Sequence, residues 1–309
     1  MTRAVDDVTA DRPVKQSPSA FRQISLSRRI RNQAARTIFI LCFVVGVIPL
    51  VWLLYTVIAN GVGAITDPHW WFGDGYGIDT TTDYGAGLAP AIVGSIVQAL
   101  IAAIISVPIA VLVAILLVEY PTSRLAKPVS FMVDILAGVP SIVATLFIFT
   151  VFVIGLSLGQ SGFMVALALI LLMIPIVVRS TEEMLKLVPD ELREASYALG
   201  IPKWKTIMRI VIPTALSGML SGIFLAIARI MGETAPVLIL AGPASSMIKT
   251  NPFEGGMNSL PLFIKDMWSA SQPASSFYYW GAALTLIIII AALNLIAAVA
   301  SKVLAPKTR

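Results

Sequence analysis

The chain has 309 residues, of which 57% are hydrophobic and 13% are charged, and its mean hydropathy is +0.88. A composition this apolar excludes an ordinary soluble globular protein. The net charge of +5 does not indicate nucleic-acid binding, because most of the basic residues fall in the predicted loops on one side of a membrane. A single cysteine, Cys42, excludes an internal disulfide.

Six hydrophobic runs have about the length needed to cross a bilayer, since roughly 20 apolar residues span the hydrocarbon core. Such runs are expected to be helices, because a lone span has no other way to satisfy its backbone polar groups in lipid. Five of them contain a proline, which fits either kinked packing or broken helices that line a pathway. The sequence therefore predicts an all-α integral membrane protein with six transmembrane helices, at residues 37–58, 89–118, 129–157, 162–178, 214–240 and 280–304.

The Lys and Arg residues predict the orientation. All but three of the 22 fall on one side if residues 1–36, a basic N-terminal arm, lie in the cytoplasm. We therefore expect a multi-pass protein of the cell membrane with both termini cytoplasmic and with the arm against anionic lipid headgroups. Residues 37–60 form the first transmembrane helix, and residues 61–86 an external loop with an interfacial aromatic belt at His69–Trp71. A second external loop, 242–279, is expected to hold either a short interfacial or re-entrant helix or a docking face for an external partner.

A polar segment at residues 181–213 lies between two of the hydrophobic runs. Asp190 is suited to be the N-cap of a short amphipathic helix, and Gly200 to end that helix as the glycine after its C-cap. Pro202 then begins a second helix that enters the membrane at Pro213. Because a short amphipathic helix buries little by itself, we expect it to occupy a groove in a partner protein.

Charged residues also occur inside the predicted spans. Arg229 lies near the middle of the fifth run, where a charge costs at least about 2.5 kcal/mol. Glu233 follows on the same predicted helix face, so the two side chains form either a neutral pair or an anion site built on the guanidinium. Asp134 is expected to contact the headgroup region or Lys127, and Arg179 to be a snorkelling anchor.

A carboxylate at an anion site has a consequence for selectivity. Glu233 would accept a hydrogen bond from a protonated oxyanion such as hydrogen phosphate, whereas fully ionised sulfate has no proton to donate. Our hypothesis is that Glu233 disfavours sulfate.

The polar loop resembles the cytoplasmic signature of ABC importer membrane subunits, which is Glu-Ala-Ala, three residues, Gly, nine residues, Ile, one residue and Leu-Pro. The departures are Ser for the second Ala and Ile for Leu, and the matching residues are Glu194-Ala195-Ser196, Gly200, Ile210 and Ile212-Pro213. In that family the segment is the coupling helix that enters a cleft of the ATPase. The resemblance assigns ATPase coupling to Glu194, Ala195, Ser196, Gly200 and Pro213.

The chain contains no phosphate loop ending in Gly-Lys-Ser/Thr, so it is not the ATPase itself. An ATPase partner that binds ATP and Mg²⁺ is therefore implied, and we expect no cofactor, catalytic site or metal site in this chain.

Residues 229–236, Arg-Ile-Met-Gly-Glu-Thr-Ala-Pro, are similar to a segment of phosphate ABC permeases of the PstA type. The segments at 134–142 and 280–284 also resemble that family, and the similarity covers about 87–305. It implies the type I ABC importer permease fold and a substrate pathway at Arg229, Glu233, Thr234, Asp134 and Ser141. The implied partners are a PstC-type permease subunit, an ATPase dimer and an external phosphate-binding protein.

Two other functions fit parts of the sequence. A permease for another oxyanion or small solute would have the same coupling loop, so only Arg229 and Glu233 distinguish it. A membrane sensor or scaffold that moves no solute is disfavoured, because it gains nothing from a costly intramembrane charge.

Overall fold

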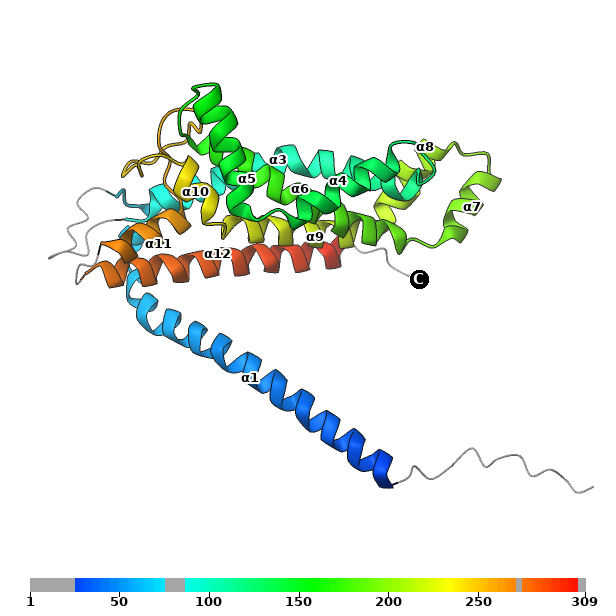
Figure 1. The fold of residues 1–309 in the computed structure, drawn as a ribbon, viewed down its shortest axis with the longest axis horizontal. Helices are drawn as coiled ribbons and strands as arrows, with labels where there is room; N and C mark the ends of the chain where they lie inside the picture. The colour runs from blue at the N-terminus through cyan, green and yellow to red at the C-terminus, as the bar shows by residue number, and fades with distance from the viewer. Residues whose placement is uncertain (1–25, 76–86, 271–273, 305–309) are drawn as a thin grey trace, which may run out of the picture. The chain divides into compact units, whose positions relative to one another are not determined.

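The computed structural model describes residues 26–75, 87–270 and 274–304, and every regular element in them is a helix (Figure 1). Residues 1–25 of the predicted arm and residues 76–86 of the first external loop lie outside the described residues. The chain divides into two compact units between Tyr55 and Thr56. That boundary falls within helix α1 (Leu26–Ile65), whose 40 residues begin well before the predicted residue 37 and correspond to a length of about 60 Å.

The second unit contains all the other helices. They are α2 (Pro68–Phe72), α3 (Ala89–Glu119), α4 (Ala126–Gly138), α5 (Ser141–Ile148), the π-helix η1 (Phe149–Gly155), α6 (Gly162–Lys186), α7 (Asp190–Ala198), α8 (Lys203–Thr206), the π-helix η2 (Ile207–Val211), α9 (Ile212–Met231), α10 (Ala235–Leu240), α11 (Leu260–Ser269) and α12 (Ser275–Leu304). In the described residues, five helices are long and apolar enough to cross a membrane when α8, η2 and α9 count as one. The bent pair formed by α4 and by α5 with η1 supplies a sixth span.

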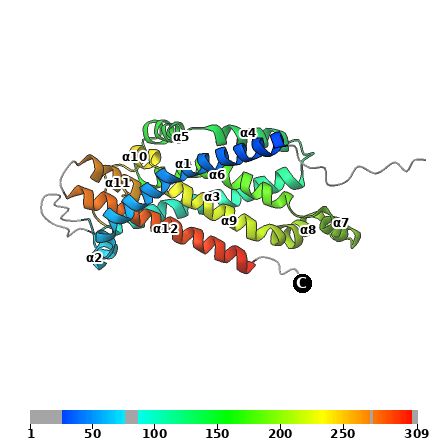
Figure 2. The same cartoon turned by 90° about the horizontal axis from the view of Figure 1, so that it is seen from below.

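Helix α6 is the centre of the second unit. Within its most apolar window 61% of the residues are buried, against 22% for α3, α9 and α12. Helices α3, α4, α5, α9 and α10 pack against it, and α12 packs against α9 and α11 (Figures 1 and 2). Side chains carried by α6 are therefore held in place from several sides.

The predicted third span, 129–157, is not one continuous helix, and of the two alternatives for its proline the structure shows the broken helix. Its two halves are bent by 104°. Pro140 explains the break, because proline cannot donate a helical hydrogen bond and it disfavours the helical conformation at the preceding residue. Val139 accordingly has φ −72° and ψ 124°, which is extended backbone.

The predicted fifth span is also interrupted. Helix α9 ends at Met231 with Gly232 as its C-cap, and α10 begins three residues beyond that cap with Pro236 in its first turn. At its other end α9 follows the π-helical turn η2, which ends at Val211, two residues before Pro213. The wider turn accommodates a proline that lacks the N–H needed for an α-helical bond.

The predicted external segments are packed more deeply than expected. Trp70 is 2% exposed, its Nε1 donates to Thr285 Oγ1 at 3.0 Å, and its ring stacks on Tyr278. An interfacial belt is therefore wrong for Trp70. The short helix predicted within 242–279 is present as α11, but its apolar residues Pro261–Phe263 are buried, so they do not form a docking face.

Candidate functional site

A cavity of about 450 Å³ lies where the two helix breaks meet α6. The break between α4 and α5 contributes Leu136, Ala137, Val139, Pro140 and Ser141, α6 contributes Leu172, Pro175, Ile176 and Arg179, and the end of α9 with the following break contributes Arg229, Ile230 and Glu233. Each break has a local cause, Pro140 in the first and Gly232 with Pro236 in the second. The cavity lies beside both breaks.

The structure brings together most of the predicted pathway residues. Ser141, Arg229 and Glu233 line this cavity, whereas Thr234 is exposed and does not. Arg229 is exposed and has no ion pair among the residues that the structure describes. Pairing with Glu233 through consecutive turns of one helix, one of our two alternatives, is not observed, because α9 ends before Glu233 is reached.

Arg179 is the cavity residue whose role the sequence analysis missed. It is not a snorkelling anchor: its guanidinium pairs with Asp134 of α4 and donates to Glu182 Oε2 at 2.5 Å and to Ser130 Oγ at 3.2 Å. Lys186 also contacts Glu182, at 2.7 Å. Asp134 therefore reaches the cavity through Arg179, and its expected contact with Lys127 or the headgroups is replaced by this pair.

The two arginines of the cavity differ in charge balance. The guanidinium of Arg179 is neutralised by carboxylates from α4 and α6. Arg229 lines the cavity and has no carboxylate partner in the described chain. The cavity wall also includes Ser141, the first residue of α5, where the positive end of the helix dipole lies. This arrangement is suited to an anion.

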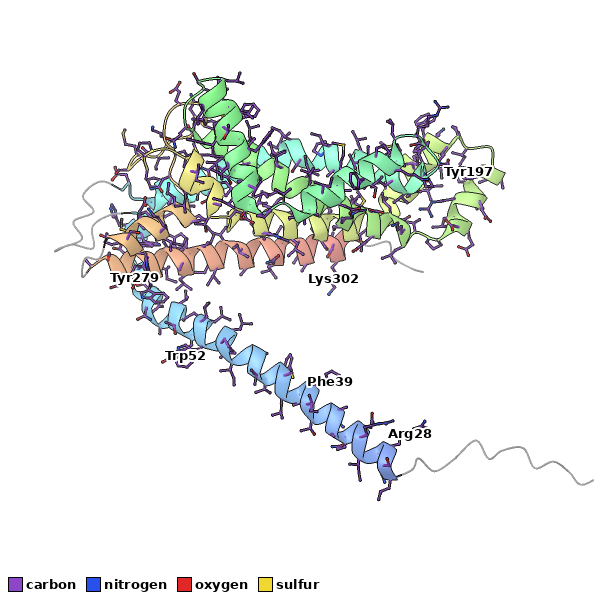
Figure 3. All side chains as sticks on the ribbon, viewed as in Figure 1. Arg28, Phe39, Trp52, Tyr197, Tyr279 and Lys302 are labelled. Atoms are coloured by element: carbon purple, nitrogen blue, oxygen red, sulfur yellow. The ribbon has the colours of Figure 1, made fainter. Side chains whose placement is uncertain are left out.

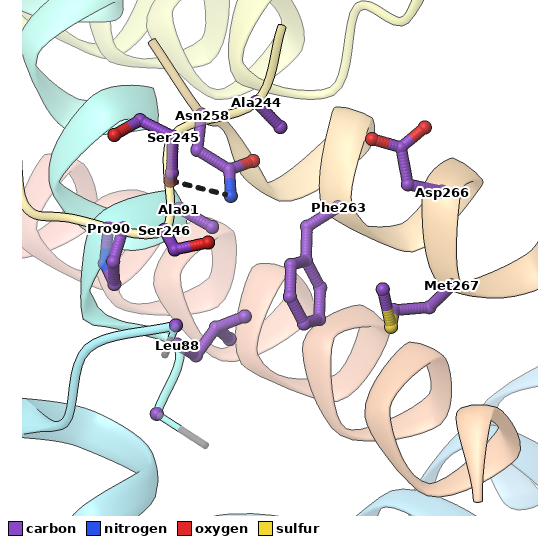
Figure 4. Close-up of a pocket in the computed structure, with 12 residues that line it drawn as sticks. Leu88, Pro90, Ala91, Ala244, Ser245, Ser246, Asn258, Phe263, Asp266 and Met267 are labelled. Atoms are coloured by element: carbon purple, nitrogen blue, oxygen red, sulfur yellow. Dashed lines mark hydrogen bonds between the residues drawn. The ribbon is translucent and has the colours of Figure 1, made fainter. Parts of the chain in front are cut away.

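A smaller pocket, lined by the start of α3, by α11 and by the segment before α11, has different chemistry (Figure 4). It measures about 130 Å³, and Leu88, Asn258, Phe263, Asp266 and Met267 are among its lining residues. None of its lining residues is Lys, Arg or His, and Asp266 adds a negative charge. We therefore do not assign the anion site to it.

The predicted coupling loop forms α7 and α8 at the end of the unit opposite α10 and α11 (Figure 1), with Tyr197 on α7 (Figure 3). Pro189 is the N-cap of α7, and Asp190 is its first residue, so the predicted cap was one residue late. The predicted end is confirmed: Gly200 has φ +75°, and the amides of Gly200 and Ile201 donate to the carbonyls of Tyr197 and Ser196. This is the Schellman arrangement that favours glycine.

The coupling residues that the resemblance assigned have two different environments. Glu194, Ala195 and Gly200 are exposed, as a docking surface requires. Ser196 is 2% exposed, and its hydroxyl lies 2.8 Å from that of Thr206, so it joins α7 to α8. Pro213 is exposed in the first turn of α9.

Comparisons with known proteins agree with this geometry. Residues 106–309 match the family model described as the binding-protein-dependent transport system inner membrane component. The phosphate transport system permease protein PstA 1 of Mycobacterium tuberculosis (strain CDC 1551 / Oshkosh) is 53% identical over 288 residues, which cover 93% of each chain. PstA of Mycobacterium leprae is 51% identical over 94% of each chain. The structure of the inward-facing MetNI methionine ABC transporter shares the fold, with a TM-score of 0.55 at 18% identity over 71% of this chain and 94% of that one.

Proposed function

Because the chain belongs to the family of binding-protein-dependent transport system inner membrane components, and within it to the PstA phosphate transport permeases, we propose that it is a membrane subunit of an ATP-driven phosphate importer. It is a multi-pass permease with the type I ABC importer permease fold. It forms half of the translocation pathway, and ATP hydrolysis belongs to a separate subunit.

We further propose the partners and the orientation. A PstC-type subunit completes the pathway, a dimer of ATPases that binds ATP and Mg²⁺ docks on α7, and a phosphate-binding protein approaches the opposite end. The exposure of Glu194, Ala195 and Gly200 supports the proposal that the ATPase docks on α7. The one-sided distribution of Lys and Arg supports placing α7 and both termini on the cytoplasmic side of the cytoplasmic membrane. In this proposal the chain itself holds no cofactor.

The observation that carries phosphate binding is the position of Arg229. A guanidinium that lines a cavity and lacks a carboxylate partner in the described chain is available to bind two oxygens of a tetrahedral anion. Arg179 is held by Asp134 and Glu182, so it contributes less net charge. Ser141 supplies a hydroxyl on the same wall, while Thr234, outside this cavity, remains a prediction for the complete pathway.

Glu233 gives the cavity a means of selecting its anion. It lies on the same wall as Arg229, so an anion held there meets a carboxylate. Hydrogen phosphate and dihydrogen phosphate can donate a hydrogen bond to that carboxylate, whereas sulfate has no proton to donate and is repelled by its charge. Replacing Glu233 by Gln keeps the size and removes the charge, and we expect sulfate to become a competitor of phosphate uptake.

For the transport cycle, we propose that ATP binding closes the ATPase dimer and displaces α7. The displacement changes access to the cavity around Arg229 from the inner to the outer side, and phosphate enters. Hydrolysis restores the inward-facing state and releases it.

Labelled phosphate uptake tests this function. Cells that lack the gene are complemented with wild type, Arg229→Gln or Arg229→Lys at matched membrane levels, with sulfate as competitor. We expect wild type to restore uptake that sulfate does not inhibit, and Arg229→Gln to lose at least about 30-fold. Arg229→Lys keeps the charge without the planar fork and should fall between them. If the wild-type protein restores no uptake but still co-purifies with an ATPase, phosphate is excluded as the substrate, and the assignment to an ABC importer stands.

A further inference from the structure

Arg193 connects α7, the proposed coupling helix, to the transmembrane helices α6 and α3. The side chain of Arg193, on α7, is only 12% exposed. Its guanidinium donates to the carbonyls of Val188 and Leu185 at 2.6 and 3.0 Å, and to Asp190 Oδ1 at 3.0 Å. The Leu185 carbonyl lies in the last turn of α6 and the Val188 carbonyl two residues beyond that helix, where carbonyls lack α-helical partners. Arg193 thus caps α6.

The same guanidinium binds the last residue of α3. Its Nε and its NH2 nitrogen each lie 3.1 Å from Oε1 of Glu119, whose side chain is 4% exposed. The Glu119 carbonyl accepts from Lys203 of α8, and the Lys203 ammonium also lies 4.3 Å from the ring centre of Tyr120. We call Arg193, Glu119 and Lys203 the α3 clasp. The guanidinium thus donates four hydrogen bonds within the chain, and its NH2 nitrogen also forms the ion pair with Glu119.

The location of the α3 clasp is unfavourable for a purely stabilising contact. A carboxylate at a helix C-terminus meets the negative end of the dipole, and a buried ion pair adds little net stability over apolar residues of the same size. What the pair does impose is a fixed geometry, because separating the charges in a buried position is strongly disfavoured. Helix α7 itself packs against α8 and η2. Its ion pair with α3 is the one that Arg193 forms with Glu119.

We propose that the α3 clasp is the positioning element that passes displacement of the coupling helix to α3 as a rigid unit. This inference rests on the proposed function, since it concerns how ATP hydrolysis is linked to transport. Helix α3 packs along α6, and α6 carries Arg179 into the cavity. The displacement of α7 therefore reaches the cavity wall through the α3–α6 pair as well as through the chain into α9.

The test uses the complete importer in proteoliposomes, with both permease subunits, the ATPase dimer and the external binding protein. Phosphate uptake and ATP hydrolysis are measured together for Arg193→Gln and Glu119→Gln. The matched control is Arg209→Gln, because Arg209 is an exposed cation of the same loop that forms no ion pair in the described chain. We expect both clasp variants to keep hydrolysing ATP while phosphate moved per ATP falls at least about fivefold, and the control to match wild type.

A covalent link separates a mechanical role from a folding role. In a Cys42→Ser background, Glu119→Cys and Arg193→Cys are joined by a bifunctional thiol crosslinker. Crosslinking should restore phosphate moved per ATP, because it replaces the α3 clasp by a bond. An unchanged ratio in the Gln variants, or a crosslinked protein that stays as uncoupled as they are, would overturn the proposal.

A distance measurement keeps this inference separate from the identity of the substrate. Spin labels are placed at Ala198→Cys on α7 and Thr122→Cys just beyond α3, both exposed positions, in the same background. Their distance should be equal without nucleotide and with a non-hydrolysable ATP analogue in wild type, and should change in Glu119→Gln. A distance that changes in wild type overturns the α3 clasp, whereas failure of phosphate uptake alone overturns only the proposed function.

Discussion

Arg193 and Arg229 are the same residue type in opposite situations. Arg193 is nearly buried, and its guanidinium makes four hydrogen bonds and two ion pairs within the chain itself. Arg229 is exposed and has no ion pair within the described residues. The comparison indicates that a guanidinium paired within the chain fixes helices to one another, whereas a guanidinium without such partners is available to bind a ligand. Unfolding experiments on the permease can test this contrast.

The largest loss of stability is expected for Arg193→Gln. It leaves the Glu119 carboxylate buried without a counter-ion and removes the cap of α6. Breaking a buried pair in this way costs about 3–5 kcal/mol. Thermal unfolding of the purified protein in detergent measures the loss, with Arg209→Gln as the matched surface change. Equal unfolding midpoints for the two variants would show that the Arg193 guanidinium does not hold the helices together.

The cavity region also depends on close packing, so its glycine should be the next most sensitive position. A Cβ at Gly222 of α9 would lie 1.6 Å from Ser180 Oγ of α6, next to Arg179. Gly222→Ala should therefore cost about 1–3 kcal/mol by overpacking. Gly46→Ala is the control, because no other atom lies within 4 Å of its added methyl group. The same unfolding assay distinguishes them, and a stable Gly222→Ala would mean that α6 and α9 separate easily.

The coupling region depends on a glycine for a different reason. Gly200 has φ +75° and open space around it, so only the backbone conformation limits substitution. Gly200→Ala should cost about 1–2 kcal/mol, and Gly200→Asn less, because asparagine tolerates this conformation better. Unfolding midpoints of the two variants should differ in that order. The reverse order would contradict the Schellman assignment.

The smallest change in stability is expected at the residue most important for transport. Arg229→Gln removes an exposed side chain with no ion pair in the described chain, so its free energy of unfolding should change by less than about 0.5 kcal/mol. Uptake should nevertheless be lost. A strongly destabilised Arg229→Gln protein would show that Arg229 is a structural residue like Arg193.

The sequence predicted the elements whose cause is local. Gly200 ended α7 as expected, because a helix stop needs only one residue with a left-handed conformation. Hydropathy predicted the long apolar helices, since bilayer thickness dictates the length of a span. It left open whether Pro140 kinks or breaks its helix, because many membrane helices continue through a proline, as α3 does at Pro108 and α6 does at Pro175.

The parts of the site that the sequence did not predict depend on contacts between distant residues. Arg179 and Asp134 are far apart in the chain, and only the packing of α4 on α6 brings them together. The same is true of Arg193 and Glu119. The sequence analysis used Arg193 only as one of the basic residues that indicate membrane topology. An acidic residue at the end of a hydrophobic run, such as Glu119, was the signal that could have indicated a buried partner.

The π-helical turn η2 lets the chain between α8 and α9 hold one extra residue without turning α8 away from α9. A π turn contains about one residue more than an α turn, so the extra residue is taken up within that turn. Deleting one residue from Ile207–Val211 would therefore restore the α-helical hydrogen-bond pattern and leave α8 and α9 in nearly the same relative orientation. The segment before α9 thus tolerates a change of length by one residue better than a continuous α-helix would.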